Sequence, residues 1–322
     1  MNDFFFLQRG ELVDLGNGEL RSLIQTYQPN ARIRNLNRRV MLVKGELDVE
    51  RIMARVACTR FAGKLLQVSN KATGFELNGM MKNYKTFACD LVNLSRKYFD
   101  MQILNDLGNY VKGQAPWLDV SLENPDVTVL LIKTEAELVI GLVEHKKSVK
   151  WKNESTRKRP YFHPVALEPR LCRAMINLAM VREDNTILDP FCGTGSVMLE
   201  ANSMKINAIG CDLSSKMCRG ALTNLRNSNG FLINCDALSL PLKMNDIDAI
   251  VTDLPYGRAA STLKRRPKEL LNEFLDVIKE MKGKRYCIMC KKGDEQEFLN
   301  IIEQYDIYEH KSLTRKLMVL CN

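Results

Sequence analysis

Four short apolar stretches between residues 187 and 257 each end in an aspartate, and this series constrains the fold more than any other feature. The aspartates are Asp189, Asp212, Asp236 and Asp253. A loop with two glycines follows the first of them, at Gly193 and Gly195. In an open parallel α/β sheet, ligands bind at the carboxyl ends of the strands. We therefore expect a Rossmann-like α/β sheet in which the four carboxylates face one pocket.

The first three aspartates suit S-adenosylmethionine, which joins a nucleoside to an amino acid. Asp189 precedes the glycines and can reach an ammonium group directly or through water. Asp212 occupies the place of the acid that binds ribose hydroxyls in dinucleotide folds, about twenty residues past the glycines. Asp236 is placed to accept a hydrogen bond from the adenine amine. A dehydrogenase fits less well, because Met198 replaces the third glycine of its fingerprint.

The C-terminal part of the chain favours the same fold class. We predict a strand at residues 285–290, a helix at 294–304, and two strands at 305–310 and 317–321. Two strands that lie so close in sequence must pair antiparallel, because a parallel crossover needs a dozen or more residues. A parallel sheet that ends in an antiparallel hairpin is the layout of class I S-adenosylmethionine-dependent methyltransferases.

The turn after the fourth strand, Asp253-Leu254-Pro255-Tyr256, resembles the Asn/Asp/Ser-Pro-Pro-aromatic signature of methyltransferases that modify exocyclic amino groups of bases. An aryl amine is a poor nucleophile, because its lone pair is delocalised into the ring. Asp253 and the carbonyl of Leu254 can accept its two protons and localise that lone pair, which is catalysis by positioning and electrostatics. Tyr256 offers a face for stacking the base. Leu254 replaces the first proline of the signature, and we expect Leu254→Pro to be close to neutral.

A further resemblance lies upstream, where Tyr161-Phe-His163-Pro164 precedes an amphipathic helix predicted at residues 168–180. In base amino-methyltransferases that begin this way, the segment lies over the methionine end of the cofactor. The resemblance and the aspartate series together give the cofactor-binding candidates His163, Pro164, Asp189, Phe191, Gly193, Gly195, Asp212, Leu213, Asp236, Ala237 and Asp253.

The net charge and the cysteines indicate what kind of partner the protein binds and in which compartment it is expected. A net charge of +9 over 322 residues favours an anionic partner. The ten cysteines are scattered, and the one close pair, Cys287 and Cys290, falls in a predicted strand where its side chains point to opposite faces. We therefore predict no metal site and reduced thiols in a cytoplasmic protein. Residues 4–7 are too short for a signal or membrane segment, and we expect a strand there.

The N-terminal part has an alternating α+β pattern. We predict a ferredoxin-like domain over residues 1–55, with strands at 3–7 and 39–43 and helices at 19–27 and 49–61. Helices at 85–99 and 100–107 and strands at 127–133 and 137–143 follow. The run that ends in Asn124-Pro125-Asp126, with the two strands after it, resembles a THUMP domain, an RNA-binding module, over residues 56–145.

A basic linker at residues 146–162 separates this part from the predicted methyltransferase domain at 163–322. Its cations would attract phosphates, and a second basic loop directly follows the catalytic turn. The RNA-binding candidates from both are Lys146, Lys147, Lys150, Lys152, Arg157, Lys158, Arg159, Arg258, Lys264, Arg265 and Arg266.

The whole chain resembles the THUMP-domain tRNA guanosine N2-methyltransferases that act on position 10. The resemblance implies that the THUMP-like domain binds the acceptor end while the catalytic domain reaches the D-stem. It also implies that some members work with a small zinc-containing activator protein. Methylation of another tRNA or rRNA guanosine, or of DNA bases, uses the same motifs and stays open. So does a non-catalytic RNA-binding subunit.

Overall fold

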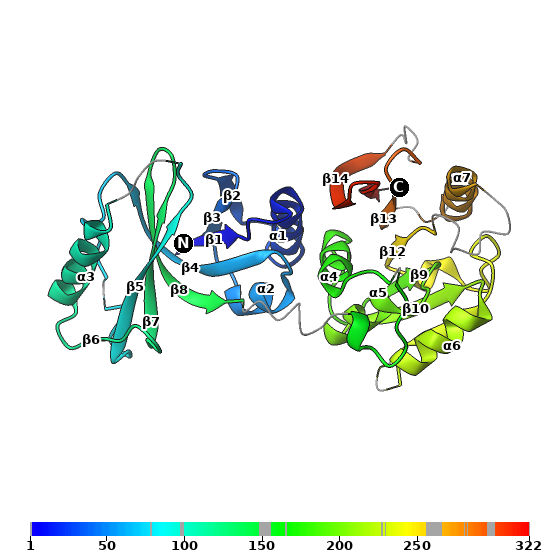
Figure 1. Ribbon diagram of the computed structural model, residues 1–322, viewed down its shortest axis with the longest axis horizontal. Coiled ribbons are helices and arrows are strands. Elements are labelled where there is room, and N and C mark those ends of the chain that lie inside the picture. The colour runs from blue at the N-terminus through cyan, green and yellow to red at the C-terminus, as the bar shows by residue number, and fades with distance from the viewer. Residues whose placement is uncertain are drawn as a thin grey trace. The chain divides into compact units, whose positions relative to one another are not determined.

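The computed structural model describes residues 2–77, 79–96, 100–147, 156–164, 166–226, 228, 230–255, 266–279, 281, 283–294 and 300–321. The chain forms two compact units (Figure 1). The first consists of Met1–Val13, Gln28–Ala54 and Thr59–Ser148, and the second of Asp14–Tyr27, Arg55–Cys58 and Val149–Asn322. The ferredoxin-like and THUMP-like domains expected from the sequence stay predictions. In the described ranges, no helix combines the length and the apolar character that a membrane crossing requires.

The first unit is built on one eight-stranded sheet of order β2-β3-β1-β4-β8-β7-β5-β6. The long strand β4 pairs antiparallel with both β1 and β8, and so joins the two halves of the sheet. Its strands are β1 (Asn2–Gln8), β2 (Arg32–Asn35), β3 (Val40–Gly45), β4 (Thr59–Ser69), β5 (Thr86–Asn93), β6 (Asp119–Val120), β7 (Val127–Lys133) and β8 (Leu138–Lys146), and its helices are α2 (Val49–Arg55) and α3 (Gln102–Gln114).

Two helices predicted for this unit are wrong in part or whole. The helix expected at residues 49–61 ends at Arg55, because β4 begins at Thr59. The helix expected at 85–99 is not present in the described residues: Thr86–Asn93 form the strand β5, residues 94–96 are neither helix nor strand, and residues 97–99 lie outside the described ranges. Phe87 of β5 is buried and lies in parallel register with Val127 of β7. Pairing with a strand 40 residues away in sequence decides this segment, and a local pattern does not contain that information.

The second unit carries a seven-stranded sheet of order β11-β10-β9-β12-β13-β15-β14. Its first five strands run parallel, and β15 pairs antiparallel with both β13 and β14. This confirms the class I methyltransferase fold predicted from the sequence. The strands are β9 (Thr186–Asp189), β10 (Asn207–Asp212), β11 (Phe231–Asn234), β12 (Ala249–Asp253), β13 (Arg285–Lys291), β14 (Ile301–His310) and β15 (Leu313–Cys321).

One prediction at the end of this sheet is wrong. The helix expected at residues 294–304 overlaps β14, which already begins at Ile301, while residues 295–299 lie outside the described ranges. Side chains along the first part of β14 alternate between half-buried and exposed, which is the period of an edge strand and not of a helix. The hairpin of β14 and β15 is therefore longer than the sequence indicated.

The second unit contains the helices α1 (Val13–Tyr27, which belongs to this unit from Asp14 on), α4 (Pro169–Leu178), α5 (Ser196–Ser203), α6 (Ser215–Asn224) and α7 (Pro267–Ile278). The amphipathic helix predicted at 168–180 is confirmed as α4. It begins with a proline in its first turn, where the missing N–H costs nothing, and it buries Leu171, Ala174 and Met175. Figure 1 labels α5 and α6 beside β9 and β10, the strands that they follow in the chain.

Candidate active site

The glycine loop and Asp189 form the first part of the site. Gly193 and Gly195 have φ values of +52° and +82°, a region that favours glycine, and Gly195 caps the start of α5. A Cβ added at Gly193 would meet no atom within 4 Å, so open space lies against the backbone there. Asp189, at the end of β9, is only 3% exposed. Its Oδ1 accepts hydrogen bonds from Thr252 Oγ1 at 2.6 Å and from the Phe191 amide at 3.3 Å.

Burial raises the pKa of Asp189 to about 7, although the hydrogen bonds from Thr252 and Phe191 oppose the change. A carboxylate that is costly to ionise while buried gains most from a cation placed next to it. The ammonium group of an amino acid is such a cation. Asp189 therefore has the chemistry expected of the group that binds the methionine end of the cofactor.

Asp212 ends β10 and ties that strand to the glycine loop. Its Oδ2 accepts a hydrogen bond from the Gly193 amide at 2.9 Å, and its Oδ1 accepts one from the Ser214 amide at 2.8 Å. Burial raises the pKa of Asp212, and these two hydrogen bonds oppose the rise. Each carboxylate oxygen has a second acceptor site, so both can still receive a ribose hydroxyl. Asp212 thus shapes the loop and keeps the capacity to bind a ligand.

The next strand brings Asp236 to the same edge of the sheet. Asp236 lies two residues beyond β11, and its Oδ1 accepts a hydrogen bond from the Leu238 amide at 3.0 Å. Asn234, the last residue of β11, donates to the backbone carbonyls of Asp212 at 2.8 Å and Leu213 at 3.0 Å. These bonds hold the ends of β10 and β11 together. The predicted positions Leu213, Asp236 and Ala237 therefore follow strands that end side by side.

The segment before α4 is fixed next to the glycine loop by one asparagine. Asn224, the last residue of α6, accepts from the Tyr161 amide at 2.9 Å and donates to the carbonyls of Tyr161 and Thr194 at 3.0 Å each. The Tyr161 ring packs so closely on Gly220 that a Cβ there would lie 2.4 Å from it. The predicted cofactor contacts His163 and Pro164 follow directly, the first half-buried and the second exposed.

The two carboxylate oxygens of Asp253, at the end of β12, have different surroundings. Its Oδ2 accepts a hydrogen bond from Arg315 Nη1 on β15 at 2.9 Å. Its Oδ1 is buried and has no hydrogen-bond partner among the residues that the structure describes. Burial raises the pKa of Asp253 to about 6, while Arg315 lowers it. Sequence reasoning missed Arg315, because the strand predicted at 317–321 begins at Leu313.

Leu254 replaces the expected proline for a visible reason. Its amide donates a hydrogen bond to the Met289 carbonyl on β13 at 2.8 Å, which a proline has no N–H to make. Its side chain is 3% exposed and packs in the apolar core with Phe274. The turn therefore gets its fixed geometry from pairing and packing, and the expectation that Leu254→Pro is neutral needs revision. Pro255 is half-buried, and Tyr256 lies outside the described residues.

The basic candidates differ in how far they are exposed. Lys146, Arg157, Lys158 and Arg266 are exposed, and Arg266 pairs with Glu269 at the start of α7. Lys147 Nζ donates to the backbone carbonyls of residues 53 and 54. Arg159 Nη1 donates to Ser196 Oγ at 2.5 Å, at the first turn of α5. These two cations have structural partners that the sequence did not indicate. The other candidates, Lys150, Lys152, Arg258, Lys264 and Arg265, lie outside the described residues.

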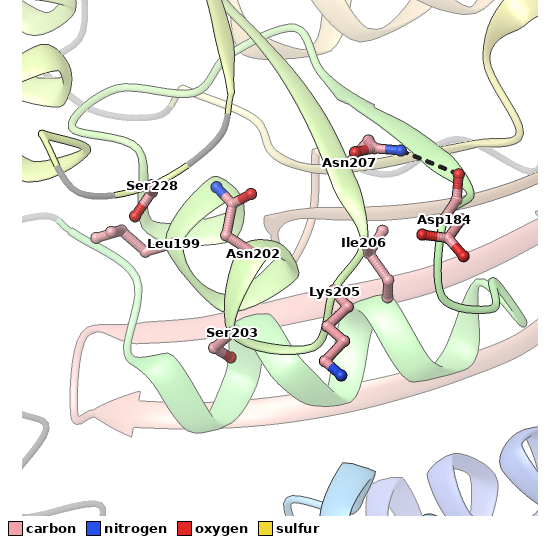
Figure 2. A pocket seen from close by; sticks show the side chains of 8 residues that line it. All are labelled: Asp184, Leu199, Asn202, Ser203, Lys205, Ile206, Asn207 and Ser228. Carbon is pink, nitrogen blue, oxygen red and sulfur yellow. Dashed lines mark hydrogen bonds between the residues drawn. The ribbon is translucent and has the colours of Figure 1, made fainter.

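A cavity of about 580 Å³ lies at the other end of the same strands, and Figure 2 shows the side chains that line it. It is lined by the last residues of α5 and the start of β10, where Asn207 Nδ2 donates to the Asp184 carbonyl at 3.0 Å. Asn207 is the first residue of β10, whereas Asp212 is the last. Ligands of such sheets bind at the carboxyl ends of the strands. The cavity is therefore separate from the cluster of aspartates.

Two protein families match the chain. The family described as RMKL-like, methyltransferase domain, matches residues 156–317, which is half of the chain and contains all four aspartates. The family described as DNA methylase matches residues 80–223, a stretch that begins in the first unit and stops before Asp236 and Asp253. The first match covers the complete site, and the second covers part of it.

Individual relatives extend the likeness to the whole chain. The tRNA (guanine(10)-N2)-dimethyltransferase of Methanothermobacter thermautotrophicus is 38% identical over 173 residues, which are 51% of each chain. The enzyme of the same name from Methanocaldococcus jannaschii is 28% identical over an alignment that covers 98% of both chains. The crystal structure of TrmN from Thermus thermophilus has a TM-score of 0.58 with 17% identity, and the match covers 100% of both chains, which shows the shared fold.

Proposed function

Because this chain belongs to the RMKL-like methyltransferase family, and within it to the tRNA guanine N2-methyltransferases, we propose that it methylates the N2 amine of a guanosine in tRNA, at position 10. The observation that carries the proposal is the carboxylate of Asp253, which has one oxygen bound by Arg315 and the other, a buried atom, without a partner among the described residues. An amine is the kind of group that such an oxygen can bind.

The residues present fit S-adenosylmethionine. Asp189 offers a buried carboxylate to the ammonium group, and Asp212 offers acceptors to the ribose hydroxyls. The open space against Gly193 lets the ligand approach the backbone. When bound, the cofactor supplies a sulfonium methyl group, which is electrophilic. Asp236, Ala237, Phe191 and His163 stay predicted cofactor contacts.

Asp253 has two tasks in this proposal. Its Oδ1 accepts a hydrogen bond from the guanine amine, which localises the lone pair of the nitrogen. The Leu254 carbonyl accepts the second one. The hydrogen bond from the Leu254 amide to Met289 fixes the preceding peptide, between Asp253 and Leu254, and so helps to position Leu254. After methylation the amine is more acidic, and Asp253 takes its proton. Tyr256 would stack on the base and so keep the nitrogen in line with the methyl group.

Binding of tRNA belongs to the same proposal. The exposed cations Lys146, Arg157 and Lys158 precede the site in sequence and attract phosphates. We propose that the first unit binds the acceptor end and that the catalytic unit reaches the D-stem.

The state of the cysteines bears on the cellular location. All ten cysteines are free thiols, which suits a reducing cytoplasm. Activity of the purified chain alone decides whether the small zinc-containing activator protein is needed.

The first experiment identifies the product. Purified protein is incubated with labelled S-adenosylmethionine and unmodified tRNA, and the modified nucleoside is mapped by mass spectrometry. We expect N2-methylated guanosine at position 10, and the mass separates mono- from dimethylation. A methyl group on another tRNA guanosine, on rRNA or on a DNA base would assign the chain to one of the other classes. Cofactor binding without transfer would indicate a non-catalytic subunit.

The second experiment tests Asp253. Loss of one preorganised catalytic group costs on the order of a hundred- to a thousandfold in rate, so Asp253→Ala should show that loss in single-turnover transfer at saturating cofactor. Cofactor affinity should stay close to that of the unaltered protein. Arg315 can only donate, so it should bind the amide oxygen of Asp253→Asn and turn the NH2 group toward the guanine. This variant should be as damaged as Asp253→Ala.

A matched control is Asp306→Ala. Asp306 lies on β14, is 44% exposed in its side chain and pairs with Lys292 and Lys316. This variant removes an aspartate from the same sheet, outside the cluster that ends the parallel strands, and should transfer methyl groups at the normal rate. Full activity of Asp253→Ala would mean that the catalytic turn has been misidentified.

A further inference from the structure

We propose that Arg315 is a positioning residue for methyl transfer, which holds one oxygen of Asp253 in an ion pair and thereby presents the other oxygen, ionised, to the guanine amine. The inference rests on the proposed function, because it assigns Asp253 the role of acceptor. Arg315 comes from β15, in the antiparallel hairpin that closes the sheet, and not from the signature turn.

Geometry gives the two Asp253 oxygens different tasks. Arg315 Nη1 donates to Oδ2 at 2.9 Å, and the same nitrogen lies 3.5 Å from Met289 Sδ. Oδ1 is buried, and none of the described residues donates to it. A carboxylate turns about its Cβ–Cγ bond, so fixing one oxygen fixes the direction of the other. Because Arg315 is only 5% exposed, the packing around it fixes the guanidinium as well.

Charge supports the same role. A buried carboxylate tends to take up a proton, which would remove its charged acceptor. Arg315 opposes this by stabilising the ionised form. Glu309 Oε1 on β14 lies 3.6 Å from Arg315 Nε and raises the pKa of Asp253. The state of Asp253 is therefore set by a row of three charges, Asp253, Arg315 and Glu309.

Other titratable groups surround this row. Asp189 on β9 and the Cys172 thiol on α4 both interact with the Asp253 charge. Glu168 and His310 interact with Glu309. A bound cofactor cation keeps Asp189 ionised, so at saturating cofactor the acid side of the pH profile of kcat reports Asp253.

Arg315 is too buried to serve as a phosphate contact. With 5% of its surface exposed, the guanidinium has little area to offer to an RNA backbone. If it did bind phosphate, its loss would lower tRNA affinity. A positioning role predicts instead that tRNA and cofactor affinities stay the same while the pH dependence of the rate changes.

The central variant is Arg315→Gln, which removes the charge and keeps an N–H donor. Loss of an opposite charge within about 4–6 Å raises a carboxyl pKa by about one to three units. The acid limb of kcat should move up by that amount, and activity lost at pH 7 should return as the pH rises to 9. Arg315→Lys keeps the charge without the planar guanidinium and should shift the limb less. A purely structural defect would not recover at high pH.

The control is Lys316→Gln on the same strand. Lys316 Nζ pairs with Asp306 Oδ1 at 2.5 Å, and adjacent strand residues point to opposite faces. This variant removes one cation at 12% side-chain exposure without touching Asp253, so its pH profile should match that of the unaltered protein. If the acid limb of the kcat profile of Arg315→Gln coincides with those of Lys316→Gln and of the unaltered protein, the inference is overturned.

A second variant keeps the test decisive if Arg315→Gln does not fold. Glu309 has a side-chain exposure of 34%, so Glu309→Gln should fold. Because the Glu309 charge raises the pKa of Asp253, its removal should move the acid limb down, opposite to Arg315→Gln. An acid limb that stays in place or moves up contradicts the inference.

The role of Arg315 and the proposed function can fail separately. If the unaltered protein transfers no methyl group to tRNA guanine, the proposed function fails. If it does and only these shifts are missing, the role of Arg315 fails alone.

Discussion

Cofactor affinity should depend on pH through Asp189, and the structure gives the size of the effect. Burial raises the pKa of Asp189 to about 7 in the free protein. A cation held against the carboxylate lowers such a pKa by about one to three units. The free protein therefore carries a proton on Asp189 below pH 7 and must release it when the cofactor binds. Affinity should fall as the pH falls.

The magnitude follows from the two protonation equilibria. With a free pKa of about 7 and a bound pKa of about 4 to 6, the dissociation constant should be about four- to eightfold larger at pH 6 than at pH 7.5. A tenfold change would equal about 1.4 kcal/mol. At pH 6 the same values predict the release of about 0.4 to 0.9 proton for each cofactor bound.

Titration calorimetry in two buffers with different heats of ionisation measures both quantities. Asp189→Asn cannot take up a proton, so its affinity should be weaker but independent of pH in this range. Thr252→Val removes the hydroxyl that donates to Asp189 Oδ1 and keeps the shape of the side chain. Because that hydrogen bond lowers the pKa of Asp189, its loss should move the transition to higher pH. Equal affinity at pH 6 and pH 7.5, with no proton released, would refute the reasoning.

Two further predictions concern the catalytic turn and the basic linker. Leu254→Pro should lower the free energy of unfolding by about 1 kcal/mol or more, because it removes the hydrogen bond to Met289; a denaturation midpoint equal to that of the unaltered protein would contradict this. Neutralising Lys146, Arg157 and Lys158 together should weaken tRNA binding and reduce its salt dependence by about 0.7–0.9 log units for each phosphate that the protein no longer neutralises. If the salt dependence of tRNA binding does not change, the basic linker only connects the two units and does not bind phosphates.

The cofactor half of the site was predictable because its information is local. Asp189 and Asp212 end apolar strands, and the topology of a parallel sheet brings such ends together without any detailed knowledge of packing. The hydrogen bond between Asp212 and the Gly193 amide could not be foreseen, since it depends on the path of the loop. The aspartates at the strand ends were thus identified in advance, and the bonds around them were not.

Long-range pairing explains what was missed. The segment of β5 was predicted as a helix, and it is a strand because β7 lies beside it. Arg315 was missed for a related reason. Its partner Asp253 is 62 residues away in sequence, and Arg315 is brought to the site by the antiparallel pairing of its strand, β15, with β13. The apolar alternation of a strand does not reveal which polar residue at its start will be buried. Only the register of β13 and β15 places that guanidinium.

The distance in sequence between Asp253 and Arg315 limits how far the four-residue signature can be moved between proteins. An engineer who transplanted residues 253–256 onto another Rossmann-like sheet would carry over the acceptor and leave its counter-ion behind. The recipient would gain a buried acid with no cation beside it, which would be neutral near pH 7 and inactive there. A working transplant must include β15 in its native register with β13, so the smallest portable unit is the sheet edge and not the turn.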